Sequence, residues 1–173
     1  MKNISSKSTA TPQDPIEEKN AFEALVCTNT SLRLAARRLG NLYDEALAPV
    51  GLKSTQVALL SETTRMATAN EGRAPTLQEL AAKLAIQISA LTHALKPLIR
   101  DGLVELRADE QDRRTKRAVL TPAGNALLHE AIVHWNTANQ RVEEVLGVES
   151  AASLRAVADY VASDEFLSAY MGE

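Results

Sequence analysis

One segment of the chain, residues 100–122, restricts the possible folds more than any other. Two short apolar runs, residues 103–106 and 118–120, lie on either side of a charged stretch. Gly102 can end a preceding helix in the left-handed conformation, and the pair Thr121-Pro122 is typical of a helix start. The segment therefore predicts a helix end, a strand, a charged hairpin tip, a second strand and a new helix. A hairpin placed directly after a helix indicates a winged helix-turn-helix.

The hairpin tip is strongly basic. Four basic residues follow Asp112 within five positions, namely Arg113, Arg114, Lys116 and Arg117. An arginine on a thin β-ribbon can enter the minor groove of DNA while the preceding helix lies in the major groove. This pattern predicts binding to double-stranded DNA, and the alternative is an ordinary solvated hairpin tip.

Two helices are predicted before the hairpin. Thr76 and Glu79 have the spacing of a capping box, which begins a short helix that ends near Leu84. A second helix, residues 89–101, turns Leu91, Leu95, Leu98 and Ile99 inward and contains Pro97, where a slight kink is expected. The residues of this helix that are available to face DNA are Ser89, Ala90, Thr92, His93 and Lys96.

Composition favours a mainly α fold (α+β), with a two-stranded wing as its β part. Hydrophobic residues make up 45% of the 173 residues and aromatic residues only 3%, so Leu, Ala and Val must form most of the core. The net charge is -3, yet residues 83–117 hold eight basic and five acidic side chains, a net charge of +3. This asymmetry is typical of a local DNA-binding face on an acidic body.

Several other classes of protein find no support in the sequence. A single cysteine excludes an internal disulfide, and no apolar run is long enough to span a bilayer. Residues 1–17 are polar and lack the apolar centre of a signal peptide, so we expect a disordered tail on a cytoplasmic protein. The sequence contains neither a phosphate-binding glycine loop nor a pair of metal ligands on one helical face. We therefore expect no enzyme activity, no cofactor and no metal site.

Long helices are predicted at both ends of the chain. Residues 18–50 carry a seam along one face of a helix. Its members recur at spacings of three and four and are Phe22, Leu25, Asn29, Leu32, Ala36, Leu39, Tyr43 and Ala46. A similar seam follows Pro122 as far as Leu146, and a last helix, with a break near Asp164, ends at about Tyr170. The winged region, residues 51–121, cannot bury both seams. We therefore expect residues 18–50 and 122–173 to form a twofold homodimer.

Residues 25–146 of the sequence resemble the MarR family of bacterial transcriptional regulators. The resemblance is sharpest in the helix from Leu91 to Leu98, in Asp101-Gly102-Leu103-Val104, in Asp112-Arg113-Arg114 and in Leu120-Thr121-Pro122-Ala123-Gly124. It implies a dimeric repressor or activator that is released from a palindromic operator by a small ligand or an oxidant. It also implies that Arg114 enters the minor groove and that Asp112 holds this arginine. The sequence departs from the family pattern at His93, where many members have arginine, and at Ala85, where glycine is common.

Three further residues are candidates for regulation. Tyr43 and Trp135 are candidates to line a pocket for a small effector of phenolic or hydroperoxide type, although Trp135 also fits simple seam packing. Cys27 lies near the start of the first helix, as the reactive cysteine does in an oxidant-sensing branch of the resembled family. We expect a buried structural cysteine, with a redox sensor as the alternative.

The alternative function for the whole chain is a winged-helix module that binds proteins and not DNA.

Overall fold

The structure is a computed structural model that describes residues 27–172 and divides into two units, residues 1–37 and 38–173. The predicted tail, residues 1–17, and the seam residues Phe22 and Leu25 lie outside the described range. In the first unit, Cys27 precedes helix α2 (Thr28–Ala46), whose C-terminal end belongs to the second unit. The helix expected over residues 18–50 thus ends four residues early, and a separate 3₁₀ turn, η1 (Ala48–Val50), follows it.

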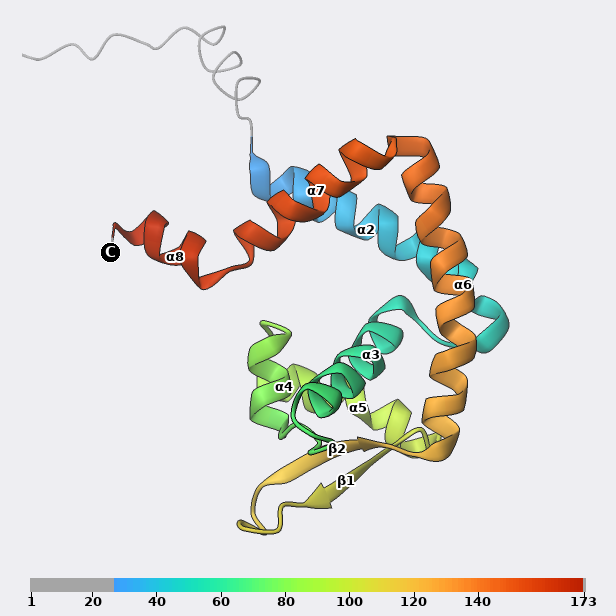
Figure 1. Cartoon of the computed structure of the whole chain (residues 1–173), viewed down its shortest axis with the longest axis vertical. Coiled ribbons are helices and arrows are strands. Elements are labelled where there is room, and N and C mark those ends of the chain that lie inside the picture. The colour runs from blue at the N-terminus through green and yellow to red at the C-terminus, as the bar shows by residue number, and fades with distance from the viewer. Residues whose placement is uncertain (1–26, 173) are drawn as a thin grey trace, which may run out of the picture. The chain divides into compact units, whose positions relative to one another are not determined.

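The second unit has the element order that the sequence predicts. After η1 come α3 (Ser54–Ala69), α4 (Leu77–Lys83), α5 (Ile88–Arg100), β1 (Val104–Ala108), β2 (Lys116–Leu120), α6 (Pro122–Leu146), α7 (Val148–Val161) and α8 (Asp164–Met171). The two strands form an antiparallel hairpin below α3, α4 and α5 in Figure 1. The prediction of a mainly helical chain with a two-stranded wing is confirmed.

Local capping explains where the central helices begin. The Thr76 N–H donates to Glu79 Oε2 (2.7 Å), and the Glu79 N–H donates to Thr76 Oγ1 (3.1 Å), which is the expected capping box of α4. Thr121 caps α6 by accepting from the Gly124 N–H (3.0 Å). For α3 the N-cap is Lys53, and the N–H of the first helical residue, Ser54, donates to Asp44 Oδ1 (2.7 Å), near the end of α2.

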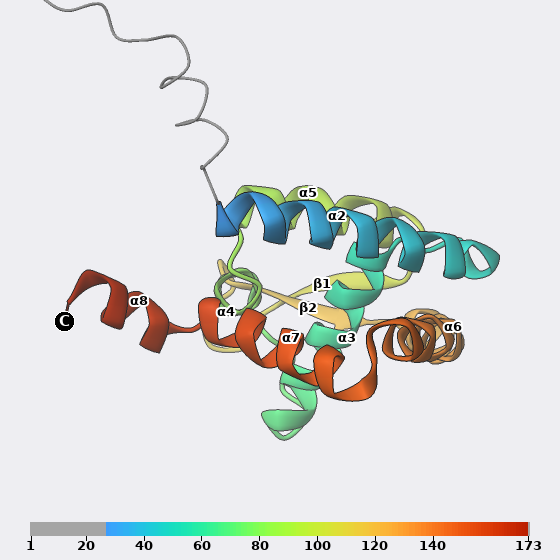
Figure 2. The same ribbon diagram turned by 90° about the horizontal axis from the view of Figure 1, so that it is seen from above.

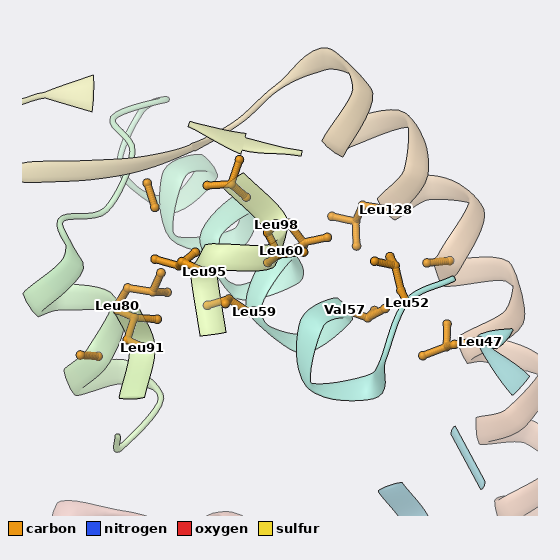
Figure 3. Packing of buried hydrophobic residues seen from close by; sticks show 14 residues of the cluster. Leu47, Leu52, Val57, Leu59, Leu60, Leu80, Leu91, Leu95, Leu98 and Leu128 are labelled. Carbon is orange, nitrogen blue, oxygen red and sulfur yellow. The ribbon is translucent and has the colours of Figure 1, made fainter. Parts of the chain in front are cut away.

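A leucine core joins α3, α4, α5 and α6. Figure 3 shows leucine side chains of α3, α4 and α5 gathered in one cluster, with Leu128 of α6 at one side of it. The largest fully buried side chains are Leu47, Leu60, Leu80, Leu91, Leu95 and Leu98. Truncating one such leucine to alanine typically costs about 2–5 kcal/mol. This core fixes the direction in which α5 presents its opposite face.

The C-terminal helices bury much less of their apolar surface. Figure 2 looks nearly along α6 and shows α7 leaving at a steep angle to it. Ala151 is the buried residue of α7, whereas Val148, Val157 and Tyr160 are 69%, 59% and 46% exposed. Leu167 and Tyr170 of α8 are also exposed. The single chain thus leaves an apolar surface on its last two helices.

Candidate nucleic-acid interface

Helix α5 has a buried face and an exposed polar face. Leu91, Leu95 and Leu98 point into the core. All five residues predicted to face DNA are exposed, namely Ser89, Ala90, Thr92, His93 and Lys96. The Thr92 hydroxyl donates to the Ile88 carbonyl within the helix (2.8 Å), so it offers an external partner its lone pairs and its methyl group.

Ala85, between α4 and α5, has a backbone conformation that suits glycine. Its φ is +51°, in the left-handed region, and its N–H donates to the Ala82 carbonyl (3.1 Å). A side chain at such an angle meets steric strain that glycine avoids. Alanine at this position, in place of the glycine of the family pattern, therefore lowers the stability of the protein. The turn between α4 and α5 is retained.

The tip of the wing, residues 109–115, presents two arginines to solvent. Arg113 and Arg114 are exposed, and within residues 27–172 neither guanidinium has a carboxylate partner. Lys116 is also exposed, but it belongs to β2 and not to the tip. An exposed guanidinium without a partner keeps its donors free for phosphate or base atoms.

Asp112 shapes the tip in a different way from the one implied by the family resemblance. Its Oδ1 accepts from the backbone N–H of Arg114 (3.0 Å), and its Oδ2 accepts from the Thr115 hydroxyl (2.9 Å). No hydrogen bond joins Asp112 to the Arg114 guanidinium in the described chain. Asp112 thus holds Arg114 through its backbone and closes the turn, and a hold on the arginine side chain stays a prediction.

A buried carboxylate that the sequence analysis did not single out lies at the base of the tip. The Asp109 side chain is only 7% exposed and accepts from the guanidinium groups of Arg117 and Arg73. Its other oxygen accepts from the backbone N–H groups of Gln111 (2.9 Å) and Asp112 (3.1 Å). The Arg117 guanidinium, followed by these backbone donors, holds the pKa of Asp109 far below its usual range.

Arg117 also differs from expectation. It was predicted on the basic hairpin tip, whereas it is the second residue of β2 and its side chain is 13% exposed. It donates to the Ala74 carbonyl as well as to Asp109. No local pattern could identify this role, because Ala74 is 43 residues away along the chain. An arginine directly before the apolar run 118–120 was the available signal.

The two aromatic candidates for an effector pocket are in contact with each other. The rings of Tyr43 and Trp135 have centroids 4.4 Å apart at an angle of 50°. The Tyr43 hydroxyl donates to Asn139 Oδ1 (2.9 Å), and burial raises the pKa of Tyr43. Trp135 packs against the leucine core. The structure therefore brings both residues together, between the end of α2 and the middle of α6.

Cys27 is exposed, which contradicts the expectation of a buried structural cysteine. Hydrogen bonds from the side chain and backbone of Thr30 lower the pKa of its thiol. Its carbonyl accepts from the Ser31 N–H (3.1 Å) as α2 begins. A thiol with a lowered pKa is more reactive than an ordinary one at neutral pH.

The chain is similar to a family of known regulators in both sequence and structure. A model of the MarR family matches residues 60–116, which include α4, α5 and β1. The transcriptional regulator MosR of M. tuberculosis, in complex with DNA, is 34% identical with a TM-score of 0.63, over 78% of this chain and 97% of that chain.

The chain belongs to the MarR family. Two more distant structures share its fold. The transcriptional repressor CouR bound to a 23-mer DNA duplex is 22% identical, with a TM-score of 0.70 over 87% of this chain and 99% of that chain. A mutant of E. coli MarR complexed with operator DNA is 21% identical, with a TM-score of 0.68 over 86% of this chain and 99% of that chain. No curated protein matches the sequence at a significant level.

As a MarR-family protein, the chain is a transcriptional regulator. Its candidate interface has two parts, the exposed face of α5 and the tip of the wing. Among residues 27–172, no helix is long and apolar enough to cross a membrane, and no cluster of three potential metal ligands occurs.

Proposed function

We propose that this MarR-family regulator binds a palindromic DNA operator as a homodimer and represses the gene beside it. The observation that carries the proposal is the pair of exposed arginines on the wing, next to a helix whose outer face is polar and exposed. The helix would read base edges in the major groove through Ser89, Ala90, Thr92, His93 and Lys96. The wing would contribute Arg113, Arg114 and Lys116. MosR, CouR and the MarR mutant, all solved with DNA, support this assignment.

Selection from a library of genomic fragments, followed by a footprint of the selected DNA, tests the proposal. We expect a protected region with twofold symmetry and half-sites about one helical turn apart. Affinity should fall steeply with salt, because a dimer with two helices and two wings would make about 6–10 phosphate contacts. Absence of any salt-sensitive, sequence-specific binding would favour the alternative, a module that binds proteins.

The homodimer is supported by the apolar residues that α7 and α8 leave exposed. Val148, Val157, Leu167 and Tyr170 are each more than half exposed in the single chain. Apolar patches of this kind mark protein interfaces. Residues 18–50 and 122–173 would supply the dimer contacts, and residues 51–121 would supply the DNA-binding region.

Release from DNA would follow binding of a phenolic or hydroperoxide effector. Tyr43 and Trp135 would line its pocket, where displacement of the Tyr43 hydroxyl from Asn139 would disturb the contact between α2 and α6. If a hydroperoxide is the signal, the exposed Cys27 thiolate would be oxidised to a sulfenic acid. Peroxide would then release wild-type protein from DNA and leave Cys27→Ser bound. Equal release of both would exclude Cys27 as the sensor.

A further inference from the structure

The wing needs support from outside the hairpin. Its last backbone pair is Ala108 with Lys116, and the seven residues of the tip extend beyond that pair. A two-stranded hairpin alone is marginally stable in water. Any residue that fixes the tip relative to α5 would therefore influence where the exposed arginines are held.

The segment before α4 supplies such support to β2. The Ala118 N–H donates to the Pro75 carbonyl (3.0 Å), and Thr76 forms a β-bridge with Arg117. The Arg117 guanidinium adds a hydrogen bond to the Ala74 carbonyl and lies 3.7 Å from Glu79 Oε2. Residues 74–76 thus attach the wing to the helix-turn-helix.

Asp109 connects this attachment to the tip. One carboxylate oxygen accepts from Arg117 and from Arg73 (3.2 Å), and the other accepts from two backbone N–H groups of the tip. Both oxygens therefore have two donors. The Asp109 N–H also donates to the Thr115 carbonyl (3.0 Å), which closes the tip at its base.

The connection continues to Arg114 without a break. Asp112, whose N–H donates to Asp109, accepts in turn from the Arg114 N–H through its own carboxylate. The path runs from Ala74 through Arg117, Asp109 and Asp112 to the backbone of Arg114. Each step is a hydrogen bond, and the first two side chains are largely buried.

We propose that Asp109, Arg117 and Arg73, together called the wing lock, are positioning residues that hold Arg114 in place for the minor groove. This proposal rests on the proposed function of Arg114. The wing lock converts a flexible hairpin into a preorganised one, which lowers the entropy lost on binding DNA. It acts through Arg114 and touches no DNA itself.

A double-mutant cycle tests the wing lock. Operator affinity is measured by fluorescence anisotropy for wild type, Arg117→Met, Arg114→Ala and the double variant. We expect Arg117→Met to weaken binding about tenfold in the wild-type background and less than about twofold in the Arg114→Ala background, because residues that act as a unit are not additive. Arg65→Met, which removes the exposed pair with Glu62 in α3, should leave affinity unchanged in both backgrounds.

Amide hydrogen exchange without DNA gives a second readout. The N–H groups of Gln111, Asp112 and Arg114 should exchange about tenfold faster in Arg117→Met, with α5 amides unchanged. If Arg117→Met does not fold, Arg73→Met serves instead, because the Arg73 side chain is 52% exposed and donates one hydrogen bond, to Asp109. That milder change should have effects of the same kind and smaller size.

The outcomes separate the two proposals. Equal loss of affinity in both backgrounds, or no acceleration of exchange at the tip, would overturn the wing lock and leave the proposed function standing. If Arg114→Ala binds the operator as tightly as the wild type does, both the wing lock and the proposed role of Arg114 in the minor groove are overturned. Faster exchange at the tip together with a non-additive cycle supports both.

Discussion

Neighbouring residues of the wing tip are held in very different ways. The Asp109 side chain is 7% exposed and has four hydrogen-bond donors. Arg114, five residues later, is exposed, and within residues 27–172 it is bonded only through its backbone. The difference divides the tip into residues that set its shape and residues whose side chains are available. Substitutions at the two kinds of position should therefore have separable effects.

Arg114→Ala should weaken operator binding by about tenfold or more, which corresponds to about 1.4 kcal/mol, and leave Tm unchanged. The reason is that the guanidinium is exposed and has no partner to lose in the described chain. Anisotropy titrations and thermal unfolding check the two parts. A clear drop in Tm would assign Arg114 a structural role instead.

Asp112→Ala should weaken binding nearly as much, although for another reason. Removing this carboxylate takes away the acceptor for the Arg114 N–H and the Thr115 hydroxyl, so the turn loosens. Asp112→Asn, which keeps an acceptor oxygen, should retain most of the affinity in the same titration. Equal losses in both variants would point to the charge and not to the turn.

Ala85→Gly should stabilise the protein by about 0.5–1 kcal/mol. The strain of a left-handed alanine, about 1–2 kcal/mol, exceeds the extra chain entropy that glycine brings to the unfolded state. Chemical denaturation measures the change. Ala82→Gly, inside α4, is the matched control and should destabilise by about 1 kcal/mol.

Among the elements, α6 and the turn between α5 and β1 meet in a very close contact. A Cβ built on Gly124 would overlap the Leu103 carbonyl oxygen. The same carbonyl accepts from the Thr121 N–H (3.0 Å), and the Thr121 hydroxyl donates to the Gly102 carbonyl (2.6 Å). The first turn of α6 thus packs directly against the backbone of the residues that join α5 to β1.

Gly124→Ala should destabilise the protein by about 1–3 kcal/mol, since backbone must move to make room for the methyl group. Ala123→Gly, at the exposed neighbouring position, should cost less than about 1 kcal/mol. Urea titrations compare the two. A neutral Gly124→Ala would show that α6 can shift without loss of packing.

Asp109 of the wing makes the free energy of unfolding depend on pH in the acid range. Folding lowers the pKa of Asp109, so the unfolded chain binds more protons there. The stabilisation from Asp109 is complete above the unfolded pKa near 4 and is lost as pH falls towards the lower folded value. Glu79, which faces Arg117 and also has a lowered pKa, changes stability in the same direction.

Asp109→Asn should lower Tm at pH 7 by several degrees and weaken the dependence of unfolding free energy on pH below about 4. Arginine side chains stay charged throughout this range, so the difference between variant and wild type isolates the carboxylate. Denaturation at a series of pH values gives the comparison. Parallel pH curves for the two proteins would show that Asp109 is not the responsible group.

The sequence predicts elements well where the signals are local. The capping box of α4, the glycine after α5 and the Thr-Pro start of α6 each involve residues within four positions, and all three were predicted correctly. The strands are longer than their apolar runs, because Arg107, Ala108, Lys116 and Arg117 extend the ladder. The role of Arg117 depends on Ala74, and a contact over that separation leaves no periodic signal.

At the scale of the whole molecule, the exposed apolar face of α7 determines the expected assembly. Val157, Tyr160 and Leu154 are 59%, 46% and 40% exposed, while Ala151 packs inward. Helical geometry of about 100° per residue places the first three on one side of α7 and Asp159 on another. A dimer would remove this face from water.

Val157→Glu should therefore convert the proposed dimer to monomer without unfolding the winged region, because it places a charge in the apolar contact. Asp159→Lys, on the other side of α7, should leave the dimer intact. Sedimentation velocity distinguishes the species, and circular dichroism verifies helicity. A dimer that survives Val157→Glu would move the interface away from this part of α7.

The way the tip is held also bears on how such regulators diverge. The Asp109 carboxylate accepts hydrogen bonds from the backbone N–H groups of Gln111 and Asp112. The Asp112 carboxylate accepts one from the backbone N–H of Arg114. The side chains at 110, 111 and 113 take no part in these bonds, so mutation can replace them while the fold persists. Under the proposed function, a duplicated copy could therefore change its contacts with DNA at these three positions without loss of the fold.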